Sequence, residues 1–425
     1  MRSPIAVCLI LAACLLPGPR QAMAQSGSPD PVFDDVHFAR WSADGAGTHF
    51  NWNVSLSETL LSTHQRLFSR VVMNVGGEEL ARRRGQGQFL MMIQLTDEKG
   101  AVWQHHYPID LETIAEGVKG NDYQYVQPFF VLPGDYTVLL ALFDTASEEH
   151  TVTRRKLHVR QLRSDPLHGA WRNLPAVEFL EPCDPPDAWF LPMIRGKLDL
   201  PVKTKHPVQI DLLVNLTPTD RFAGSSRAQN VNMSVLIPVV KVLSAVNWGD
   251  AKLNVELLDL SRNRVVYRQD NVRDIDWGRA GFRLAQTAPG VIDVKSLANH
   301  RYSASFFVNE VKRRITAPLS PGQPRAVIVL SSTISFRPEV ELHPIEAGLP
   351  RGTRIFYLRY QMPRIIAGAR SGRGSGEIPV PPRLGPLTDD LEPLLKGLSP
   401  QLFDVTNAGE FRKALARIFD GVAAL

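Results

Sequence analysis

Cysteine is scarce in this sequence. Its 425 residues include three cysteines, and two of them, Cys8 and Cys14, lie within the first 24 residues. Without that segment only Cys183 remains, so the rest of the chain can form no internal disulfide. Cys183 stands in Glu-Pro-Cys-Asp-Pro-Pro and has no basic neighbour to activate it. We therefore expect a structural thiol and not a catalytic nucleophile.

Familiar catalytic and metal-binding motifs are absent from the sequence as well. It contains no His-x-x-x-His or Cys-x-x-Cys pair, no Gly-x-Ser-x-Gly turn and no Walker phosphate loop. His105 and His106 are adjacent on a predicted strand, so their side chains point to opposite faces and cannot hold one metal ion together. The sequence therefore predicts that the protein is not an enzyme.

Long apolar runs are missing beyond the N-terminus, where no stretch of 18 residues is free of charge and proline. We therefore expect no membrane span. Residues 1–24 have the pattern of a signal peptide, with Arg2, the apolar stretch Ile5–Leu16 and the cleavage site Ala22-Met-Ala24. They predict a mature chain that begins after Ala24 and a periplasmic or secreted protein. The alternative is a lipoprotein anchored at Cys14, because the preceding residues resemble a lipobox.

The charge of the chain is only mildly positive, with 48 Lys and Arg against 43 Asp and Glu and a formal net charge of +5. Residues 1–24 contribute Arg2 and Arg20 and no acid, so the remaining chain has two positive charges fewer. This small, dispersed excess predicts no nucleic-acid partner. A hydrophobic content of 44% with 21% charged residues is typical of a globular protein.

Residues 33–161 have the pattern of an all-β domain, in which short runs of β-branched and aromatic residues alternate with turn residues. Their spacing predicts an antiparallel β-sandwich. The stretch Leu132–Phe143, which contains the turn Pro133-Gly-Asp135, resembles a hairpin of an immunoglobulin-like domain. Gly76–Gly85 is predicted to be a charged loop or a short helix. The expected strands are Phe68–Val75, Gln88–Leu95, Ala101–Tyr107, Tyr123–Leu132, Tyr136–Phe143 and Thr151–Val159.

Residues 162–206 are rich in proline and predict a connecting segment, in which Trp189 and Phe190 pack locally. From residue 207 onward strands alternate with helices, as in a mainly parallel α/β sheet. The run Lys312-Arg313-Arg314 is predicted to be the solvated end of a helix. The expected helices are Asn230–Trp248, Asp293–Arg314, Asp389–Leu398 and a last one capped by Asn407. The expected strands are Val208–Val214, Leu253–Leu258, Val265–Arg268, Ala326–Leu330, Thr353–Leu358 and Leu402–Val405.

Three places in residues 207–425 resemble the von Willebrand factor type A fold. The strand Gln209–Val214 runs into a polar turn and a long helix, Leu253–Val266 resembles the family's antiparallel edge hairpin, and Leu402–Phe419 resembles its closing strand and helix. The resemblance implies a doubly wound, mainly parallel sheet. It also implies a binding site in the loops at the carboxyl edge of the sheet.

The family's metal site takes ligands from three of those loops. Where the family has Asp-x-Ser-x-Ser, this chain has Asn215, Thr217 and Thr219, and where it usually has Thr-Asp, this chain has Ser331 and Ser332. The middle loop, 289–293, lacks the usual threonine. Since Mg²⁺ prefers anionic oxygen ligands, we expect no bound metal or other cofactor. Mg²⁺ would require Asp220 or Asp293 in a rearranged loop. Otherwise the hydroxyls cap helices and bind loop backbones.

These observations predict an exported bacterial protein with a β-sandwich and a type A-like domain whose metal site is degenerate. Its function would be binding and not catalysis, with a protein or a cell-envelope surface component as the partner. The loops that carry Thr219 and Ser332 would be the contact surface. Two alternatives are a hydrolase with an unrecognised site and a structural scaffold of the cell envelope.

Overall fold

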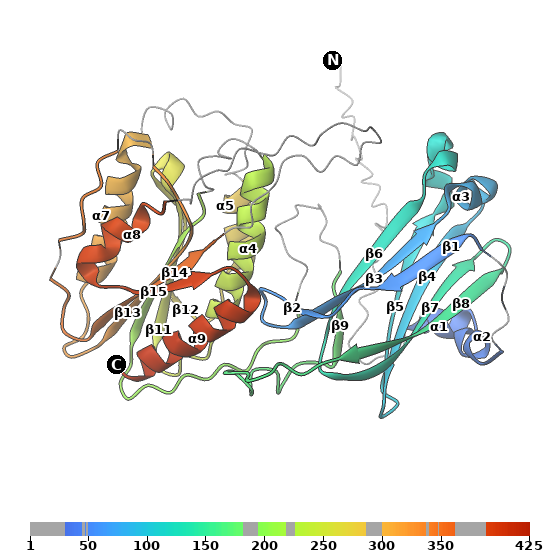
Figure 1. Ribbon diagram of the computed structural model, residues 1–425, viewed down its shortest axis with the longest axis horizontal. Helices are drawn as coiled ribbons and strands as arrows, with labels where there is room; N and C mark the ends of the chain where they lie inside the picture. The colour runs from blue at the N-terminus through green and yellow to red at the C-terminus, as the bar shows by residue number, and fades with distance from the viewer. Residues whose placement is uncertain are drawn as a thin grey trace, which may run out of the picture. The chain divides into compact units, whose positions relative to one another are not determined.

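The structure is a computed structural model that describes residues 30–44, 47, 50–181, 194–217, 226–285, 300–336, 340–346, 348–361 and 388–425 (Figure 1). The chain forms two compact units, and each is made of several separate stretches of sequence. The first unit consists of Met1–Asn51, Gly77–Asn121 and Tyr136–Lys156, and the second consists of Trp52–Gly76, Asp122–Asp135 and Leu157–Leu425. In fold class the molecule is mixed α/β, with two antiparallel sheets and one mixed sheet.

The first unit is built on an antiparallel sheet with the order β5 (Val102–Asp110), β4 (Gln88–Asp97), β7 (Gly134–Asp144) and β8 (His150–Val159). Aromatic residues of two short helices, α1 (Pro31–Asp35) and α2 (Phe38–Asp44), pack on one face of this sheet. Asp30 caps α1 by accepting a hydrogen bond from Val32 N at 3.2 Å, and Pro31 suits the first helical turn. These helices correct the prediction of an all-β segment. A third helix, α3 (Gly77–Arg83), forms in the predicted charged loop.

The other antiparallel sheet belongs to the second unit. Its strands are β1 (Trp52–Leu56), β2 (Leu60–Leu61), β3 (Leu67–Val75), β6 (Tyr123–Val131) and β9 (Val177–Phe179). All six strands predicted for residues 33–161 are present, but the predicted hairpin at Pro133 is wrong. Strands β6 and β7 flank that turn and pair in different sheets, β6 with β3 and β7 with β4.

The six-stranded sheet of the second unit confirms the predicted mainly parallel α/β arrangement. Its order is β12 (Arg264–Val272), β11 (Lys252–Asp259), β10 (Gln209–Asn215), β13 (Arg325–Ser332), β14 (Thr353–Tyr360) and β15 (Gln401–Val405). Of these six strands only β12 runs antiparallel, as the edge partner of β11. Every residue of β10 and β13 is buried, which explains why both strands are mostly apolar.

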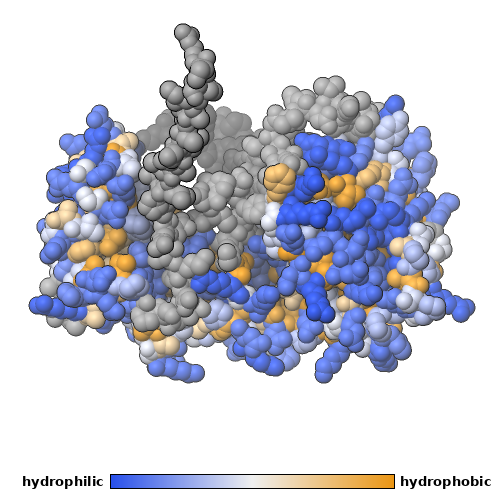
Figure 2. Space-filling model, turned by 180° about the vertical axis from the view of Figure 1, so that it is seen from behind, coloured by the Kyte–Doolittle hydropathy of each residue, from blue (hydrophilic) through white to orange (hydrophobic). Residues whose placement is uncertain are grey.

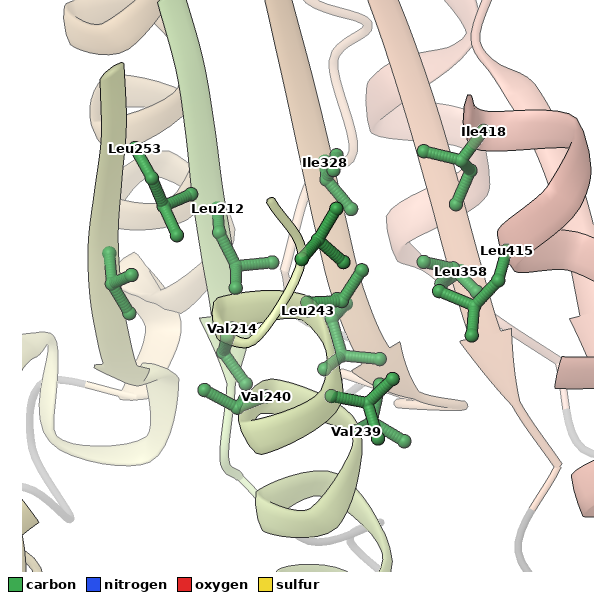
Figure 3. Close-up of a cluster of buried hydrophobic side chains, with 14 of the residues drawn as sticks. Leu212, Val214, Val239, Val240, Leu243, Leu253, Ile328, Leu358, Leu415 and Ile418 are labelled. Carbon is green, nitrogen blue, oxygen red and sulfur yellow. The ribbon is translucent and has the colours of Figure 1, made fainter. Parts of the chain in front are cut away.

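Helices cover both faces of this sheet (Figure 1). One face packs against α4 (Ser226–Ser244), α5 (Trp277–Ala285) and α9 (Ala408–Ala423), and the other packs against α7 (Ser303–Thr316) and α8 (Leu391–Leu395). Figure 3 shows Val240 of α4 next to Val214 of β10, and Leu415 of α9 next to Leu358 of β14. The sheet is therefore the middle of three layers.

The sequence locates most of these helices, with several differences. Helix α4 was predicted at Asn230–Trp248 but begins at Ser226 and ends at Ser244. Helix α5 was not predicted. The helix predicted at Asp293–Arg314 begins at Ser303 in the part that the structure describes, since residues 286–299 lie outside it. The predicted cap of α9 is confirmed, because the Asn407 side chain accepts hydrogen bonds from Gly409 N and Glu410 N. The Glu410 carboxylate accepts a hydrogen bond from Thr406 N, one residue before the cap.

The predicted solvated end at Lys312–Arg314 is wrong, because Arg314 is 5% exposed. Its guanidinium lies 2.5 Å from Glu256, 2.9 Å from Asp270 and 3.5 Å from Asp211. Asp211 also has Arg325 Nε at 3.2 Å. Burial raises the pKa of Asp211, and these cations and Asn254 partly offset that rise. The buried charges of Asp211, Glu256, Arg314 and Arg325 therefore form ion pairs with one another inside the protein.

The connecting segment 162–206 is partly anchored to the second unit. Arg412 of α9 donates hydrogen bonds to both carboxylate oxygens of Asp165, at 2.5 and 2.8 Å, and to Leu167 O at 2.9 Å. The same guanidinium lies 4.8 Å from the ring centroid of Trp171. Cys183, Trp189 and Phe190 lie outside the described residues.

In the described ranges, no helix is long and apolar enough to cross a membrane. The face drawn in Figure 2 is mostly hydrophilic, and its apolar residues appear in groups between hydrophilic ones.

Candidate functional site

The carboxyl edge of the six-stranded sheet brings together four of the five predicted site residues. Asn215 at the end of β10 donates a hydrogen bond from Nδ2 to Ser331 Oγ on β13 at 2.9 Å. Its Oδ1 accepts one from Thr217 N at 3.0 Å. Thr217 Oγ1 in turn accepts one from Leu260 N at 2.7 Å, which ties this turn to the loop after β11. The polar turn is thus a closed hydrogen-bond network.

These residues do not fit a magnesium ion. Ser331 Oγ receives the Asn215 amide and donates to Ser332 O at 2.6 Å, so its bonding capacity is used inside the protein. The bonds of this network involve amide, hydroxyl and backbone groups, whereas Mg²⁺ demands anionic oxygens in near-octahedral geometry. Among the described residues, no group of three or more His, Cys, Asp or Glu side chains could hold a metal ion. The amide of Asn215 is therefore engaged in hydrogen bonds within the protein.

The next residues along the strands form a second row, on the opposite face of the sheet. The strand register places Ser332 of β13 beside Tyr360 of β14. On the other neighbour of β13, strand β10, Leu216 follows Asn215, which pairs with Ser331. Because side chains alternate along a strand, Ser332 and Tyr360 point to the same face as Leu330, which lies in the core under α4. Asn232 of α4 joins this row by donating to Leu216 O at 2.8 Å.

This row contains three buried polar atoms without a partner in the described part of the chain: Asn232 Oδ1, Ser332 Oγ and Tyr360 OH. The three residues are 2%, 0% and 3% exposed. Burial raises the pKa of the Tyr360 hydroxyl well above its ordinary value, so the hydroxyl keeps its proton. Buried polar groups in folded proteins are nearly always bonded. At this edge, therefore, the three polar atoms of this row can still form hydrogen bonds.

The chain that follows β13 is held in place by a carboxylate. Asp389 accepts hydrogen bonds from Ile334 N at 3.3 Å and from Tyr357 OH at 2.9 Å, and Arg359 Nη1 lies 3.4 Å away. Asp390 likewise accepts one from Phe336 N at 2.5 Å. Because its oxygens fix this loop, Asp389 has a structural role at the edge.

The sequence prediction named part of this edge and missed another part. Asn215, Thr217, Ser331 and Ser332 lie on the carboxyl edge, while Thr219, Asp220 and Asp293 lie outside the described residues. Asn232 and Tyr360 were not predicted. One feature of the sequence could have pointed to Tyr360: it is the last residue of a largely buried strand and stands two residues after Leu358.

Comparison with known proteins assigns neither a family nor a function. No family model matches the chain, and no curated protein matches it. Among similar solved structures, the putative ApaA protein from Bordetella pertussis is 10% identical, with a TM-score of 0.18 over 28% of this chain and 100% of that chain. A beta-glucosidase from Listeria innocua in complex with gluconolactone is 13% identical, with a TM-score of 0.15 over 28% of this chain and 18% of that chain. Likeness at these TM-scores carries no argument.

Proposed function

We propose that this is a non-catalytic binding protein whose six-stranded sheet is a type A-like domain that holds its partner at the carboxyl edge without a metal ion. The observation that carries the proposal is the row of unpartnered atoms on Asn232, Ser332 and Tyr360 in the described part of the chain. A buried polar group without a hydrogen bond costs about 1–3 kcal/mol. Because these atoms are buried, a partner group could reach them only if α4 moved aside locally, and by supplying the missing bonds it would then recover that free energy.

The chemistry of the row suits a neutral polar group. The two hydroxyls can donate and accept hydrogen bonds, whereas Asn232 Oδ1 only accepts. A side-chain or backbone amide of a protein partner offers the matching donors and acceptor. A hydroxyl-rich cell-envelope surface component is the alternative.

The proposal includes a location outside the cytoplasm and the β-sandwich class for residues 33–161. The signal-like pattern of residues 1–24 supports export. The alternation of apolar residues along Leu67–Val75, which gives that strand one apolar face, supports the sandwich. N-terminal sequencing of the exported protein tests the location. A start after Ala24 supports it, and a start at lipidated Cys14 would make the protein membrane-anchored.

The double variant Ser332→Ala/Tyr360→Phe tests the binding edge, because it removes two hydroxyls that have no hydrogen-bond partner among the described residues. We expect its free energy of unfolding to stay level or rise by about 1 kcal/mol. Capture of the partner by immobilised protein, from a cell-envelope extract of the source organism, should fall at least tenfold. Capture by the unmodified chain should persist in EDTA.

The matched control is Tyr267→Phe on the edge strand β12, which removes a tyrosine hydroxyl bonded to Gln269. It should capture as much partner as the unmodified chain. Equal capture by the double variant, or the loss of capture in EDTA, would contradict the proposal.

A further inference from the structure

The second unit contains a cavity of about 870 Å³ away from the carboxyl edge. It lies beside the C-terminal half of α4, the start of β11 and the connection from β12 to α5. The rest of its wall consists of Ile194, Gly196, Lys197, Leu198, His64 and Arg66. Small-molecule sites in proteins typically have volumes of about 300–1,000 Å³. The cavity is therefore large enough for a ligand of ten or more non-hydrogen atoms, on the order of a short acyl chain or an aromatic acid.

Most of its wall is apolar and aromatic. Ile237 and Val242 of α4, Ile275 and Leu284 contribute aliphatic surface, and Trp248 and Trp277 contribute two indole rings. Trp248 is 5% exposed, and its Nε1 makes no hydrogen bond with the described residues. An indole N–H can only donate, so this wall offers a donor to an acceptor-bearing ligand as well as an apolar surface.

The charged residues of the wall are mainly cationic. Arg66, Lys197, Lys241 and Arg273 line the cavity together with a single acid, Asp274. Asp274 lies 3.3 Å from Lys197, but both side chains are more than three-quarters exposed, so this pair is weak. Arg66 is neutralised by Glu178 at 2.5 Å, with both side chains 4% exposed. Cations therefore outnumber acids among the residues that line the cavity.

The lowered pKa of His64 is consistent with a positively charged wall of the cavity. Burial lowers the pKa of His64 most strongly, and the charges of Lys241 and Arg66 lower it further, to about 3. The imidazole is therefore neutral at pH 7 and adds a hydrogen-bonding group without adding charge. Lys241 Nζ also lies 5.2 Å from the ring centroid of Trp277, which joins a cation to the apolar wall.

We propose that this cavity binds a small amphipathic anion, a carboxylate attached to an apolar body. The cations of the wall would hold the carboxylate, and the apolar side chains and indoles would cover the body. Nothing in this proposal depends on the carboxyl edge, because the two sites share no residue.

Decanoate, decanol and decyltrimethylammonium test the proposal, because they share a ten-carbon chain and differ in charge. Binding to the full chain is followed by tryptophan fluorescence, to which Trp248 and Trp277 of the wall contribute, and by calorimetry. Each compound is used below its micelle concentration or solubility limit. We expect decanoate to bind at least tenfold more tightly than decanol, and the cation to bind most weakly. Equal binding of all three, or no binding of decanoate at millimolar concentration, would overturn the proposal.

The variant Lys241→Gln/Arg273→Gln should lower the affinity for decanoate at least tenfold and leave that for decanol unchanged. Arg283→Gln is the matched control, because Arg283 is exposed on α5 and does not line the cavity. An equal loss of affinity in the control would assign the effect to the overall charge of the protein and overturn the proposal. Circular dichroism confirms that each variant is folded.

Discussion

Replacing Arg325 by Met is expected to lower the free energy of unfolding of the six-stranded sheet by about 3–5 kcal/mol. Arg325 is 2% exposed at the start of β13. It donates hydrogen bonds to Ala317 O at 2.8 Å and to Ile315 O, and so closes the C-terminal end of α7. Methionine fills much of the same space but cannot donate, so two carbonyls lose their partner and Asp211 loses a cation.

Urea denaturation followed by the fluorescence of Trp248 and Trp277 measures this change. Arg351→Met is the control, because Arg351 is exposed in the turn before β14, and it should change the free energy of unfolding by less than about 0.5 kcal/mol. A loss below about 1 kcal/mol for Arg325→Met would show that the buried charges at this end of the sheet contribute little.

The variant Arg412→Ala should be destabilised by a similar amount, about 3–5 kcal/mol at pH 7. The Arg412 side chain is 3% exposed and that of Asp165 is 11% exposed, so the variant leaves a largely buried carboxylate without its cation. It also frees Leu167 O and removes the contact with Trp171. Residues near Asp165 should then become accessible to protease. Arg417→Ala, at an exposed position of the same helix, should have little effect on either measurement.

This destabilisation should depend on pH. Burial alone would raise the pKa of Asp165, but the hydrogen bonds and charge of Arg412, together with the hydrogen bond from Leu167 N and the charge of His168, outweigh burial and hold the pKa below 3.8. A carboxyl group whose pKa falls on folding stabilises the protein above its unfolded pKa, and this contribution is lost as the pH falls through the folded value. The difference between the unmodified chain and Arg412→Ala should therefore be complete at neutral pH and should narrow below pH 3.8. A difference that is constant down to acid pH would contradict the ion pair.

The strands and the last helix of the second unit could be predicted because their signals are local. Leu212–Val214 and Ala326–Leu330 are continuous apolar runs, as expected for strands buried on both faces. Asn407 and the apolar residues of α9 at helical spacing locate the last helix in the same way. Helix α5 gave a weaker signal, because Gly278 and Gly281 interrupt its short apolar face.

What the sequence could not predict depends on residues far apart in the chain. The turn at Pro133 specifies a change of direction, but not that β6 and β7 pair with different strands. Arg314 has the pattern of a helix end, and only the fold brings Glu256 and Asp211 to it. Asn232 lies on a helix far from Tyr360 in sequence, so their place on one row of the candidate site follows from strand register.

We propose that the bonded amide of Asn215 stands where the type A family, which residues 207–425 resemble in sequence, holds a metal ion. Thermal melts of the unmodified chain and of Asn215→Asp/Ser331→Asp, in EDTA and in millimolar Mg²⁺, test it most directly. The two substituted side chains are hydrogen-bonded to each other across β10 and β13, so the double variant places two carboxylates face to face.

A ligand at a hundredfold excess over its Kd stabilises the native state by about 2.7 kcal/mol. The double variant should melt lower in EDTA, because the two carboxylates repel each other, and should recover with Mg²⁺. We predict no Mg²⁺ effect on the Tm of the unmodified chain. A saturable rise in the Tm of the unmodified chain with Mg²⁺ would contradict the claim.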